Sequence, residues 1–309
     1  MINSKNKTIL ITGASSGLGR ALAVQYANKG ICLILFARSE GRLKEVADIC
    51  RRRQAEVVEV ICDVKDAILT ETYMEKFCNN YNIDIIITSA GVSAGTLNHP
   101  ETTVQVKEIF STNLNGSLNI ILPALPVMIK RKHGTIVLIS SMAGLLPLAS
   151  APSYSASKAA IKIFGEAMRS YLQSFQVQVC VVIPGYIDTP MTQLNKFPMP
   201  FKISAEQAAK IIIQGINNKK GLIVFPKIIY FLLKIISLFP YPLLDYINSK
   251  LPGKPSLNST SLPHPAQSCE FEGVEPHKTT AHLAVAEDSP LDSLSKLPAR
   301  GKDRRSSSE

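Results

Sequence analysis

Seven short apolar runs rich in β-branched residues alternate with longer amphipathic segments along most of this chain. The runs cover residues 8–12, 32–36, 57–61, 83–88, 134–140, 178–183 and 222–225. Helical patterns separate them, most clearly at 18–29, 40–53, 66–80 and 153–174. Continuous apolar strands divided by helices predict a parallel sheet that is covered by helices on both faces. We therefore expect an α/β fold, a Rossmann-like doubly wound sheet of about seven strands, with ligands bound beyond the carboxyl ends of the strands.

A glycine-rich turn joins the first predicted strand to the first predicted helix. Its spacing is G-x-x-x-G-x-G, which differs from the more familiar G-x-G-x-x-G. Glycine permits a tight turn and lets the backbone approach a pyrophosphate, which the N-terminus of a helix attracts. Glycine-rich turns also occur where no ligand binds. The position between strand and helix favours a dinucleotide site that includes Gly13, Ser15, Ser16, Gly17, Leu18 and Gly19.

Arg38 follows the second strand, where an acidic residue would bind the ribose 2′-hydroxyl of NAD. An arginine accommodates the 2′-phosphate of NADP instead, because its guanidinium can form two parallel hydrogen bonds with phosphate. We therefore expect NADP(H) as the preferred cofactor and NAD(H) as the alternative, unless Arg38 only caps an exposed turn. Asp63 and Val64 follow the third strand and are candidates for the adenine end, although Asp63 could also cap the next helix.

Tyr154 and Lys158 are four residues apart in a helical pattern and therefore lie on one face of that helix. A tyrosine with an unperturbed pKa of about 10 is a poor proton relay at neutral pH, and a nearby ammonium lowers that pKa. Such a pair is common by chance. Ser141 ends the fifth strand, where a hydroxyl could hydrogen-bond a substrate oxygen as charge develops on it. Together the three residues are compatible with acid/base chemistry at a substrate oxygen.

These motifs, in this order, resemble the short-chain dehydrogenase/reductase family over about residues 5–225. The match rests on residues 12–19, Asp63, Ala90, Gly91, Asn113, Ser141, Tyr154, Lys158, Pro184, Gly185 and Thr189. The resemblance implies that Tyr154 exchanges a proton with the substrate oxygen and that Ser141 orients that oxygen. It also implies that Lys158 lowers the pKa of Tyr154 and holds the nicotinamide ribose.

The same resemblance assigns the other site residues. Asn113 would position a water that connects Lys158 to bulk solvent. Further cofactor contacts would come from Ala90, Gly91, Pro184, Gly185, Ile187 and Thr189. One departure is Thr88-Ser89-Ala90-Gly91, where the family usually has Asn-Asn-Ala-Gly. The side chain of a serine is too short to make the contacts of an asparagine amide, so the local support of the sheet should differ. The family implies ketone–alcohol interconversion by hydride transfer in a homo-oligomer, and we expect no metal.

Two apolar regions after Thr189 favour a lipid-like substrate. Residues 191–203 would form an apolar lid, with Met191, Leu194, Phe197, Pro198, Met199, Pro200 and Phe201. Residues 226–240 and 243–251 are too apolar for ordinary exposed helices and too short to span a bilayer, which takes about 20 residues. They either lie in a membrane interface, with lysines reaching the headgroups, or pack onto the domain or a dimer partner.

We therefore predict an NADP(H)-dependent reductase of a lipid-like 3-keto substrate, similar to the 3-ketodihydrosphingosine reductase type within the family. The alternatives are a 3-oxoacyl-thioester reductase, a carbonyl reductase of small or steroid ketones, and a cofactor-binding redox sensor or scaffold. We expect a dehydrogenase domain at 1–225, an apolar helical extension at 226–255 and a disordered tail at 256–309. That tail has no isoleucine and is rich in Ser, Pro, Ala and charge.

The net charge of +10 is compatible with binding to nucleic acid, an anionic membrane or a phosphorylated cofactor. Its basic clusters, 51–53 and 130–132, fall where helices should end, and no nucleic-acid motif accompanies them, so we expect no nucleic-acid partner. The cysteines form no C-x-x-C pair and predict buried free thiols: Cys32, Cys50, Cys62, Cys78, Cys180 and Cys269. With no signal peptide expected, we predict a cytoplasmic protein, or one on the cytoplasmic face of a membrane.

Overall fold

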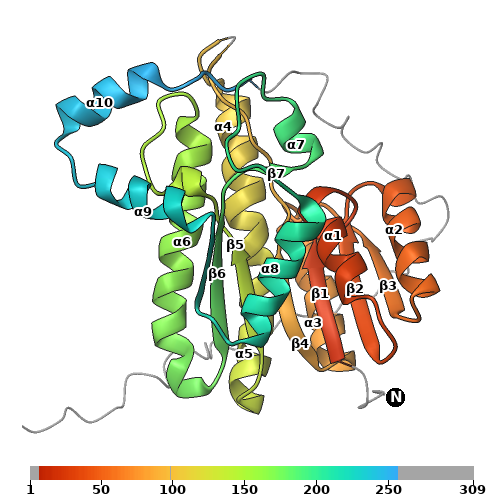
Figure 1. The fold of residues 1–309 in the computed structure, drawn as a ribbon. Helices are drawn as coiled ribbons and strands as arrows, with labels where there is room; N and C mark the ends of the chain where they lie inside the picture. The colour runs from red at the N-terminus through yellow and green to blue at the C-terminus, as the bar shows by residue number, and fades with distance from the viewer. Residues whose placement is uncertain (1–6, 98, 257–309) are drawn as a thin grey trace, which may run out of the picture. The chain divides into compact units, whose positions relative to one another are not determined.

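The main strands of the protein pair into one parallel sheet (Figure 1). A computed structural model describes residues 7–97 and 99–256. In space the strands follow the order β3-β2-β1-β4-β5-β6-β9, and every adjacent pair is parallel. Their bounds are β1 (Lys7–Thr12), β2 (Ile31–Ala37), β3 (Glu56–Ile61), β4 (Ile83–Thr88), β5 (Thr135–Ile139), β6 (Gln178–Pro184) and β9 (Leu222–Phe225). These match the seven predicted strands, and the predicted Rossmann-like fold is confirmed.

Helices cover both faces of the sheet. Successive residues of a strand point to opposite sides, so Ile9 and Ile11 of β1 pack into one apolar layer and Leu10 into the other. The first layer is covered by α1 (Gly17–Tyr26), α2 (Glu40–Arg52) and α8 (Ala205–Asn217). The second is covered by α3 (Ala67–Asn80), α5 (Gly116–Arg131) and α6 (Pro152–Leu172). Burial on both faces explains why the strands are continuous apolar runs in the sequence.

The chain winds outward in both directions from the middle of the sheet. β1 pairs with β2 on one side and with β4 on the other, so the connections that follow β1 and β4 diverge. In doubly wound folds a ligand-binding crevice lies beyond the carboxyl ends of the strands at such a switch point. The loops after β1 and β4 are therefore directed to the expected site.

The remaining elements are shorter. α4 (Thr103–Phe110) continues through a π-helical turn, Ser111–Asn115, into α5. A second parallel pair joins β7 (Ile187–Asp188) to β8 (Ile203–Ser204), and α7 (Pro190–Gln193) lies between them in sequence. Single 3₁₀ turns occupy Met142–Gly144 and Gln173–Phe175. The sequence predicts neither β7 nor β8, because two residues are too few for a periodic pattern.

Two helices, α9 (Lys227–Ile236) and α10 (Tyr241–Lys250), follow the last strand. α9 packs on the domain through buried Tyr230 and its neighbours Ile229 and Leu233. Its opposite face exposes Ile228, Phe231, Leu232 and Ile235. The predicted packing onto the domain thus describes one face of α9 only. Within 7–97 and 99–256, no helix has the length and apolar character needed to cross a membrane.

The cysteines of the described part of the chain are free thiols. Cys32, Cys50, Cys62 and Cys180 are buried, and Cys78 is partly buried. Burial raises the pKa of the Cys180 thiol to about 12 and that of Cys50 to about 11. These thiols therefore remain protonated at neutral pH and behave as small apolar side chains. Cys269 and the predicted tail beyond Ser256 lie outside the described residues.

Candidate active site

The turn after β1 brings two loops into close contact. Gly13 has a φ of 66°, and a Cβ atom there would lie 2.8 Å from the Cα atom of Ala90. A Cβ atom on Gly19 would collide with the carbonyl oxygen of Gly13. The Thr12 hydroxyl accepts a hydrogen bond of 3.0 Å from the Ala90 amide and holds the two loops together. Glycine at these two positions is therefore a steric requirement of the turn.

The N-terminus of α1 lies at the same turn. Its N-cap residue, Ser16, makes no side-chain hydrogen bond to the helix. The first-turn amides of α1 therefore lack the usual side-chain acceptor, and their partial positive charge favours a bound anion. A glycine-rich backbone next to a helix N-terminus fits the pyrophosphate of a dinucleotide.

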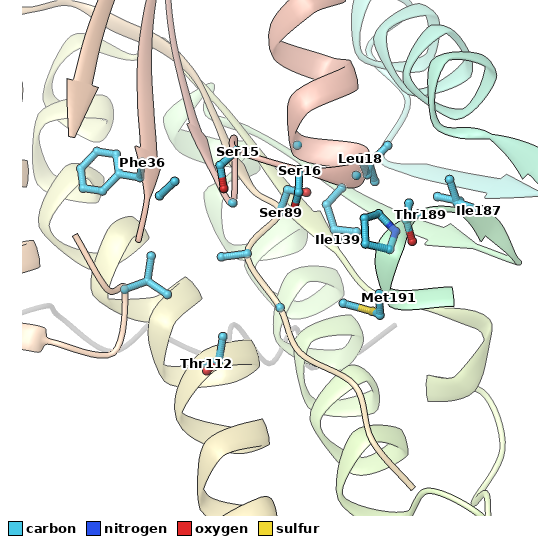
Figure 2. Close-up of a pocket in the computed structure, with 18 of the residues that line it drawn as sticks. Ser15, Ser16, Leu18, Phe36, Ser89, Thr112, Ile139, Ile187, Thr189 and Met191 are labelled. Atoms are coloured by element: carbon cyan, nitrogen blue, oxygen red, sulfur yellow. The ribbon is translucent and has the colours of Figure 1, made fainter. Parts of the chain in front are cut away.

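A cavity of about 260 Å³ extends from this turn across the ends of the strands (Figure 2). Every residue that the sequence predicts as a cofactor contact lines it: Gly13, Ser15, Ser16, Gly17, Leu18, Gly19, Arg38, Asp63, Val64, Ala90, Gly91, Tyr154, Lys158, Pro184, Gly185, Ile187 and Thr189. Figure 2 shows Phe36 on one side of this cavity and Ile187 on the other. The lining also includes Arg42 and Ser89, which the sequence pattern does not single out.

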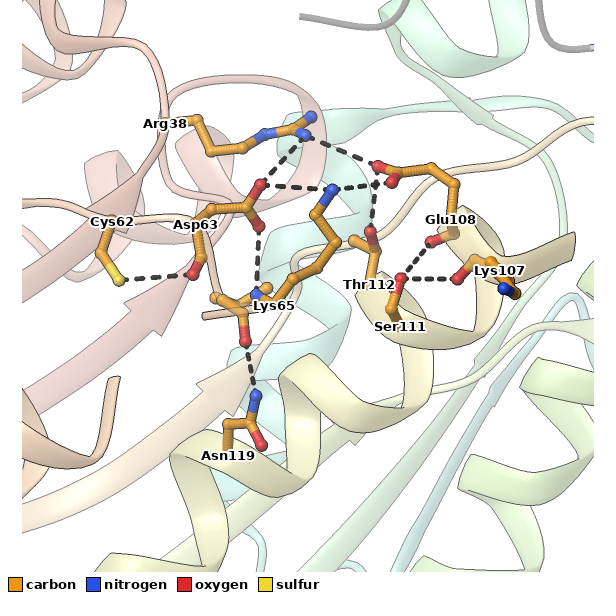
Figure 3. A network of polar contacts seen from close by, with 10 residues as sticks. Arg38, Cys62, Asp63, Lys65, Lys107, Glu108, Ser111, Thr112 and Asn119 are labelled. Atoms are coloured by element: carbon orange, nitrogen blue, oxygen red, sulfur yellow. Dashed lines mark hydrogen bonds and ion pairs between the residues drawn. The ribbon is translucent and has the colours of Figure 1, made fainter. Parts of the chain in front are cut away.

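Arg38 belongs to a network of charges beside this cavity (Figure 3). Its guanidinium lies 3.6 Å from the carboxylate of Asp63 and 3.7 Å from that of Glu108. The ammonium of Lys65 contacts the same two carboxylates, at 3.5 Å and 2.7 Å. Arg38 therefore does more than cap an exposed turn, although 40% of its side chain is exposed. The two cations and two carboxylates hold its side chain against the cavity wall.

Asp63 does not cap the helix that follows it. One of its carboxylate oxygens accepts a hydrogen bond of 3.1 Å from the amide of Lys65. The N-cap of α3 is Asp66, whose side chain accepts a hydrogen bond of 2.9 Å from the amide of Leu69. The alternative in which Asp63 caps the helix is wrong, and Asp63 instead lines the cavity with Val64.

Arg42 is a second arginine at this end of the cavity. It lies in the first turn of α2, four residues after Arg38. In the part of the chain that the structure describes, no ion pair involves Arg42. The signal that could have identified it is this spacing, because a helix that starts beside the cavity directs its first turn to the same place.

Tyr154 and Lys158 lie one turn apart on α6, beside the end of β5. The ammonium of Lys158 is 5.9 Å from the centre of the Tyr154 ring. It donates a hydrogen bond of 3.0 Å to the carbonyl oxygen of Ile139, the last residue of β5. Ser141 follows two residues later, and its hydroxyl accepts a hydrogen bond of 3.1 Å from the amide of Ala143. Sheet and helix thus bring the three predicted reactive residues together.

Burial dominates the acid–base properties of Tyr154 and Lys158. Burial raises the pKa of Tyr154, and hydrogen bonds with Ser141 and Ser93 oppose that rise. Burial also lowers the pKa of Lys158 to about 8. The net direction for Tyr154 is opposite to the expected lowering, because loss of hydration on burial outweighs the hydrogen bonds with Ser141 and Ser93. The phenol is therefore a proton donor at neutral pH.

Asn113 lies behind this pair and not in the cavity wall. Its side-chain nitrogen donates hydrogen bonds of 3.0 Å to the carbonyl of Val92 and to the hydroxyl of Ser157. A Cβ atom on Gly91 would lie 3.1 Å from the Asn113 side-chain oxygen and 3.5 Å from the Lys158 ammonium. Asn113 and Lys158 therefore border the same small space. Asn113 itself is in the π-helical turn, a feature frequent at functional sites.

The end of β4 is supported without the two asparagines usual in the resembled family. The Thr88 hydroxyl donates a hydrogen bond of 3.4 Å to the carbonyl oxygen of Val137 on the neighbouring strand β5. On the other side, Thr12 of β1 accepts the bond from Ala90. Threonines on two strands thus make the cross-strand contacts, and Ser89 is free to line the cavity.

A second cavity, of about 390 Å³, adjoins the first. The residues that line both are Ser141, Tyr154, Pro184, Gly185, Met191 and Thr192. The other walls of the second cavity are mainly apolar and include Met142, Leu146, Leu148, Phe197, Ile229, Leu233 and Leu251. Tyr154 therefore lies where the cavity with the glycine-rich turn meets the cavity with mainly apolar walls.

The predicted apolar lid contributes only part of that second cavity. Four of the seven lid residues line it: Met191, Phe197, Pro198 and Pro200. Leu194, Met199 and Phe201 do not, and Leu194 and Phe201 are 64% and 58% exposed. The other walls come from residues 141–154, from 184–186 and from the C-terminal segment, which includes Lys254, a charged residue that the sequence pattern does not identify as part of the site. No local signal marks Lys254, because the contact arises only when residues far apart in sequence fold together.

The chain is similar to known proteins over most of its length. A family model described as short chain dehydrogenase matches residues 7–197. An uncharacterized oxidoreductase from Myxococcus xanthus is 32% identical over 246 residues, which are 79% of this chain and 97% of that protein. The 11-beta-hydroxysteroid dehydrogenase-like 2 protein of Arabidopsis thaliana is 33% identical over 256 residues, 79% of this chain and 82% of that protein.

A solved structure has the same fold. It is a short-chain dehydrogenase from Sphingobium yanoikuyae in complex with NADPH, with a TM-score of 0.65 and 22% sequence identity. The match covers 79% of this chain and 92% of that one.

Replacing Gly13 with alanine should weaken NADPH binding by at least about 10-fold, because the new methyl group meets Ala90 in a backbone conformation that is strained for other residues. Gly41→Ala is the matched control, since nothing lies within 4 Å of a Cβ atom there. Calorimetric titration of both variants with NADPH measures the effect. Equal affinities of Gly13→Ala and the unsubstituted protein would contradict the assignment of this turn.

Proposed function

Because this chain belongs to the short-chain dehydrogenase/reductase family, and is therefore an NAD(P)-dependent oxidoreductase acting on CH–OH groups, we propose that it reduces a lipid-like 3-keto substrate with NADPH. The observation that carries the proposal is that Tyr154 lines both cavities. The first has the glycine-rich turn and the second has apolar walls. A proton donor at their junction can complete the reduction of a ketone that enters from the apolar side.

The residues of the first cavity fit the two ends of the cofactor. The turn at Gly13 and the N-terminus of α1 would hold the pyrophosphate. Asp63 and Val64 would face the adenine. The nicotinamide end would contact Pro184, Gly185, Ile187 and Thr189, which line the cavity beside Tyr154. The bound nicotinamide would supply the hydride, and the protein would contribute position and electrostatics.

Proton transfer to the substrate would be the task of Tyr154. Its raised pKa keeps the phenol protonated, so it can donate to the oxygen that gains negative charge during reduction. Ser141 would hydrogen-bond that same oxygen and orient it. Lys158, charged below pH 8 or so, would stabilise the phenolate that remains and hold the nicotinamide ribose. Asn113 would hold the water path to Lys158 through the space beside Gly91.

Reduction should slow as the pH rises through about 8, because the pKa of Lys158 is lowered to about 8 and its charged form exists only below that value. The measurement is kcat/KM for NADPH oxidation across this range, with a long-chain 3-keto compound, a 3-oxoacyl thioester and a small ketone. The proposal predicts turnover of the long-chain ketones in preference to the small one.

Tyr154→Phe is the matched variant for this experiment. It should slow turnover by about 100-fold or more, which is the usual contribution of a positioned acid, and leave NADPH affinity nearly unchanged. Turnover that survives Tyr154→Phe would contradict the role of the phenol. Tight NADPH binding without turnover of any ketone would favour the redox sensor or scaffold.

The preference for NADPH over NADH is supported by the charges beside the first cavity. β2 ends without a carboxylate, and Ser15, Arg38 and Arg42 line the cavity near that end. Since Arg38 is already paired with Asp63 and Glu108, Arg42 is the cation more available to a 2′-phosphate.

Arg42→Ala should reduce the ratio of NADPH to NADH affinity by about 10-fold or more, the usual worth of a hydrogen-bonded charge pair. Arg52→Ala, at the other end of α2, is the control and should leave the ratio unchanged. Titration of each variant with both cofactors gives the ratio. If Arg42→Ala and the unsubstituted protein have the same ratio of NADPH to NADH affinity, the 2′-phosphate does not bind at Arg42.

A peripheral membrane contact completes the proposal. The last two helices and their connection leave apolar side chains uncovered, including Ile228, Phe231, Leu232, Ile235, Leu238 and Leu243. Lys227 and Lys234 accompany them and would reach anionic headgroups. In this proposal residues 1–225 form the dehydrogenase domain and 226–255 an extension that rests on the cytoplasmic face of a membrane. A lipid-like ketone could then enter the adjoining cavity from the bilayer.

A homo-oligomer is part of the same proposal. Its contacts would involve the helices around Asn113 and Tyr154. Leu122 of α5 and Ile163 of α6 support this expectation, because half or more of each side chain is exposed.

The protein should sediment with vesicles of anionic and neutral phospholipid. The double variant Phe231→Ser, Leu238→Ser should reduce the vesicle-bound fraction of protein at least about 10-fold, because each change removes a large apolar side chain from the membrane interface. Ile68→Ser is the control, because Ile68 is 81% exposed on α3, far from the extension in sequence. Equal sedimentation of the double variant and the control would exclude this face as the membrane contact.

A further inference from the structure

A second lysine ammonium lies at Tyr154. The Nζ atom of Lys254 is 4.2 Å from the centre of the Tyr154 ring, closer than the 5.9 Å of Lys158. It donates a hydrogen bond to the hydroxyl of Ser93, which itself hydrogen-bonds Tyr154. Lys254 also lines the second cavity, whereas Lys158 lines only the first. It is therefore on the substrate side of the tyrosine.

The backbone around Lys254 is fixed by the loop that follows β4. The amide of Leu97 donates a hydrogen bond of 2.8 Å to the carbonyl of Lys254, and the amide of Gly95 donates one of 2.7 Å to the carbonyl of Pro255. A Cβ atom on Gly95 would collide with Lys254. These two backbone hydrogen bonds thus fix the main chain at Lys254. The Lys254 side chain therefore starts from an anchored backbone and not from a loose surface segment.

Among the residues that the structure describes, no carboxylate balances this charge. Within 7–97 and 99–256, Lys254 takes part in no ion pair, and the charged group that acts on it is the ammonium of Lys158. Burial and Lys158 lower the pKa of Lys254 to about 8, so it still carries its proton at neutral pH. A buried cation without an anion is costly, and an anionic or strongly accepting group of a ligand would relieve that cost.

We infer that Lys254 recognises a second acceptor on the substrate, and that the substrate is therefore a 3-oxoacyl chain, with a carboxylate or thioester carbonyl beside the ketone. This inference rests on the proposed function. The Lys254 ammonium lies over the ring whose hydroxyl would bond the ketone, so the second acceptor must be close to the ketone along the chain. The carboxyl group of a 3-oxo acid meets that requirement. A long-chain base with an amine there would face the Lys254 ammonium and be repelled.

Direct binding separates this inference from catalysis. The full-length protein is titrated by calorimetry with dodecanoate, dodecanol and dodecylamine, which share chain length and differ in the head group. Dodecanoate should bind about 10-fold or more tightly than dodecanol, and dodecylamine should bind most weakly. Lys254→Met should abolish this order and Lys254→Arg should keep it. Lys250→Met is the matched control, since Lys250 stacks on Tyr246 outside both cavities.

Steady-state kinetics test the role of Lys254 with ketone substrates that do or do not carry a second acceptor. For a 3-oxododecanoyl thioester, Lys254→Met should raise KM by about 10-fold with a smaller change in kcat, and for 3-dodecanone it should change neither appreciably. Lys254→Gln, which keeps a polar side chain, is a second variant in case Lys254→Met unfolds, and NADPH affinity reports folding in both.

The two proposals can fail separately. If dodecanoate is preferred through Lys254 but no ketone is reduced, the proposed function fails and the acceptor site stands. If ketones are reduced through Tyr154 but both Lys254 variants treat the thioester and 3-dodecanone as the unsubstituted protein does, the inference about Lys254 is overturned.

Discussion

The contact between the loops after β1 and β4 is the constraint on which both halves of the site depend. β1 pairs with β2 and β4, so the chain leaves the middle of the sheet in two directions and opens a crevice there. Gly13 closes the base of this crevice against Ala90 with no room for a side chain. From Ala90 the chain continues to Val92, whose amide donates a hydrogen bond to the Asn113 side chain. It then reaches Gly95, whose amide donates a hydrogen bond to the carbonyl of Pro255. One backbone approach thus joins the phosphate end, the reactive residues and the C-terminal segment.

Exclusion of water gives Tyr154 its chemistry. Burial raises the pKa of the Tyr154 phenol and lowers the pKa values of Lys158 and Lys254 to about 8, so groups with similar pKa values in water are moved apart. Both ammonium groups lie near the Tyr154 ring, Lys158 in the first cavity and Lys254 in the second. No described carboxylate forms an ion pair with either lysine. A phenolate, a developing alkoxide and an acyl carboxylate would all be stabilised in such a positive environment. Proton transfer and substrate recognition are therefore aspects of one electrostatic arrangement.

The sequence predicted those parts of the molecule that local patterns determine. The five inner strands are apolar runs because they are buried on both faces of the sheet, and the glycine turn is specified by steric contact, so both leave a signal in the chain itself. The ion pairs of Arg38 with Glu108, the place of Lys254 beside Tyr154, and the β7–β8 pair join residues that no periodicity connects. The predicted lowering of the Tyr154 pKa is wrong for a related reason. Spacing along a helix identifies the neighbouring ammonium but not how deeply the phenol is buried.

The most direct test of the account is a crystal structure with NADPH and an unreactive long-chain analogue of a 3-oxoacyl chain bound together. We predict NADPH along the glycine turn, and the analogue in the cavity lined by Leu146, Phe197 and Leu233. The oxygen that replaces the ketone oxygen would hydrogen-bond Tyr154 and Ser141. An analogue bound on the exposed face of α9 with that oxygen remote from Tyr154 would contradict it, because the two cavities would then not meet at the reacting carbon.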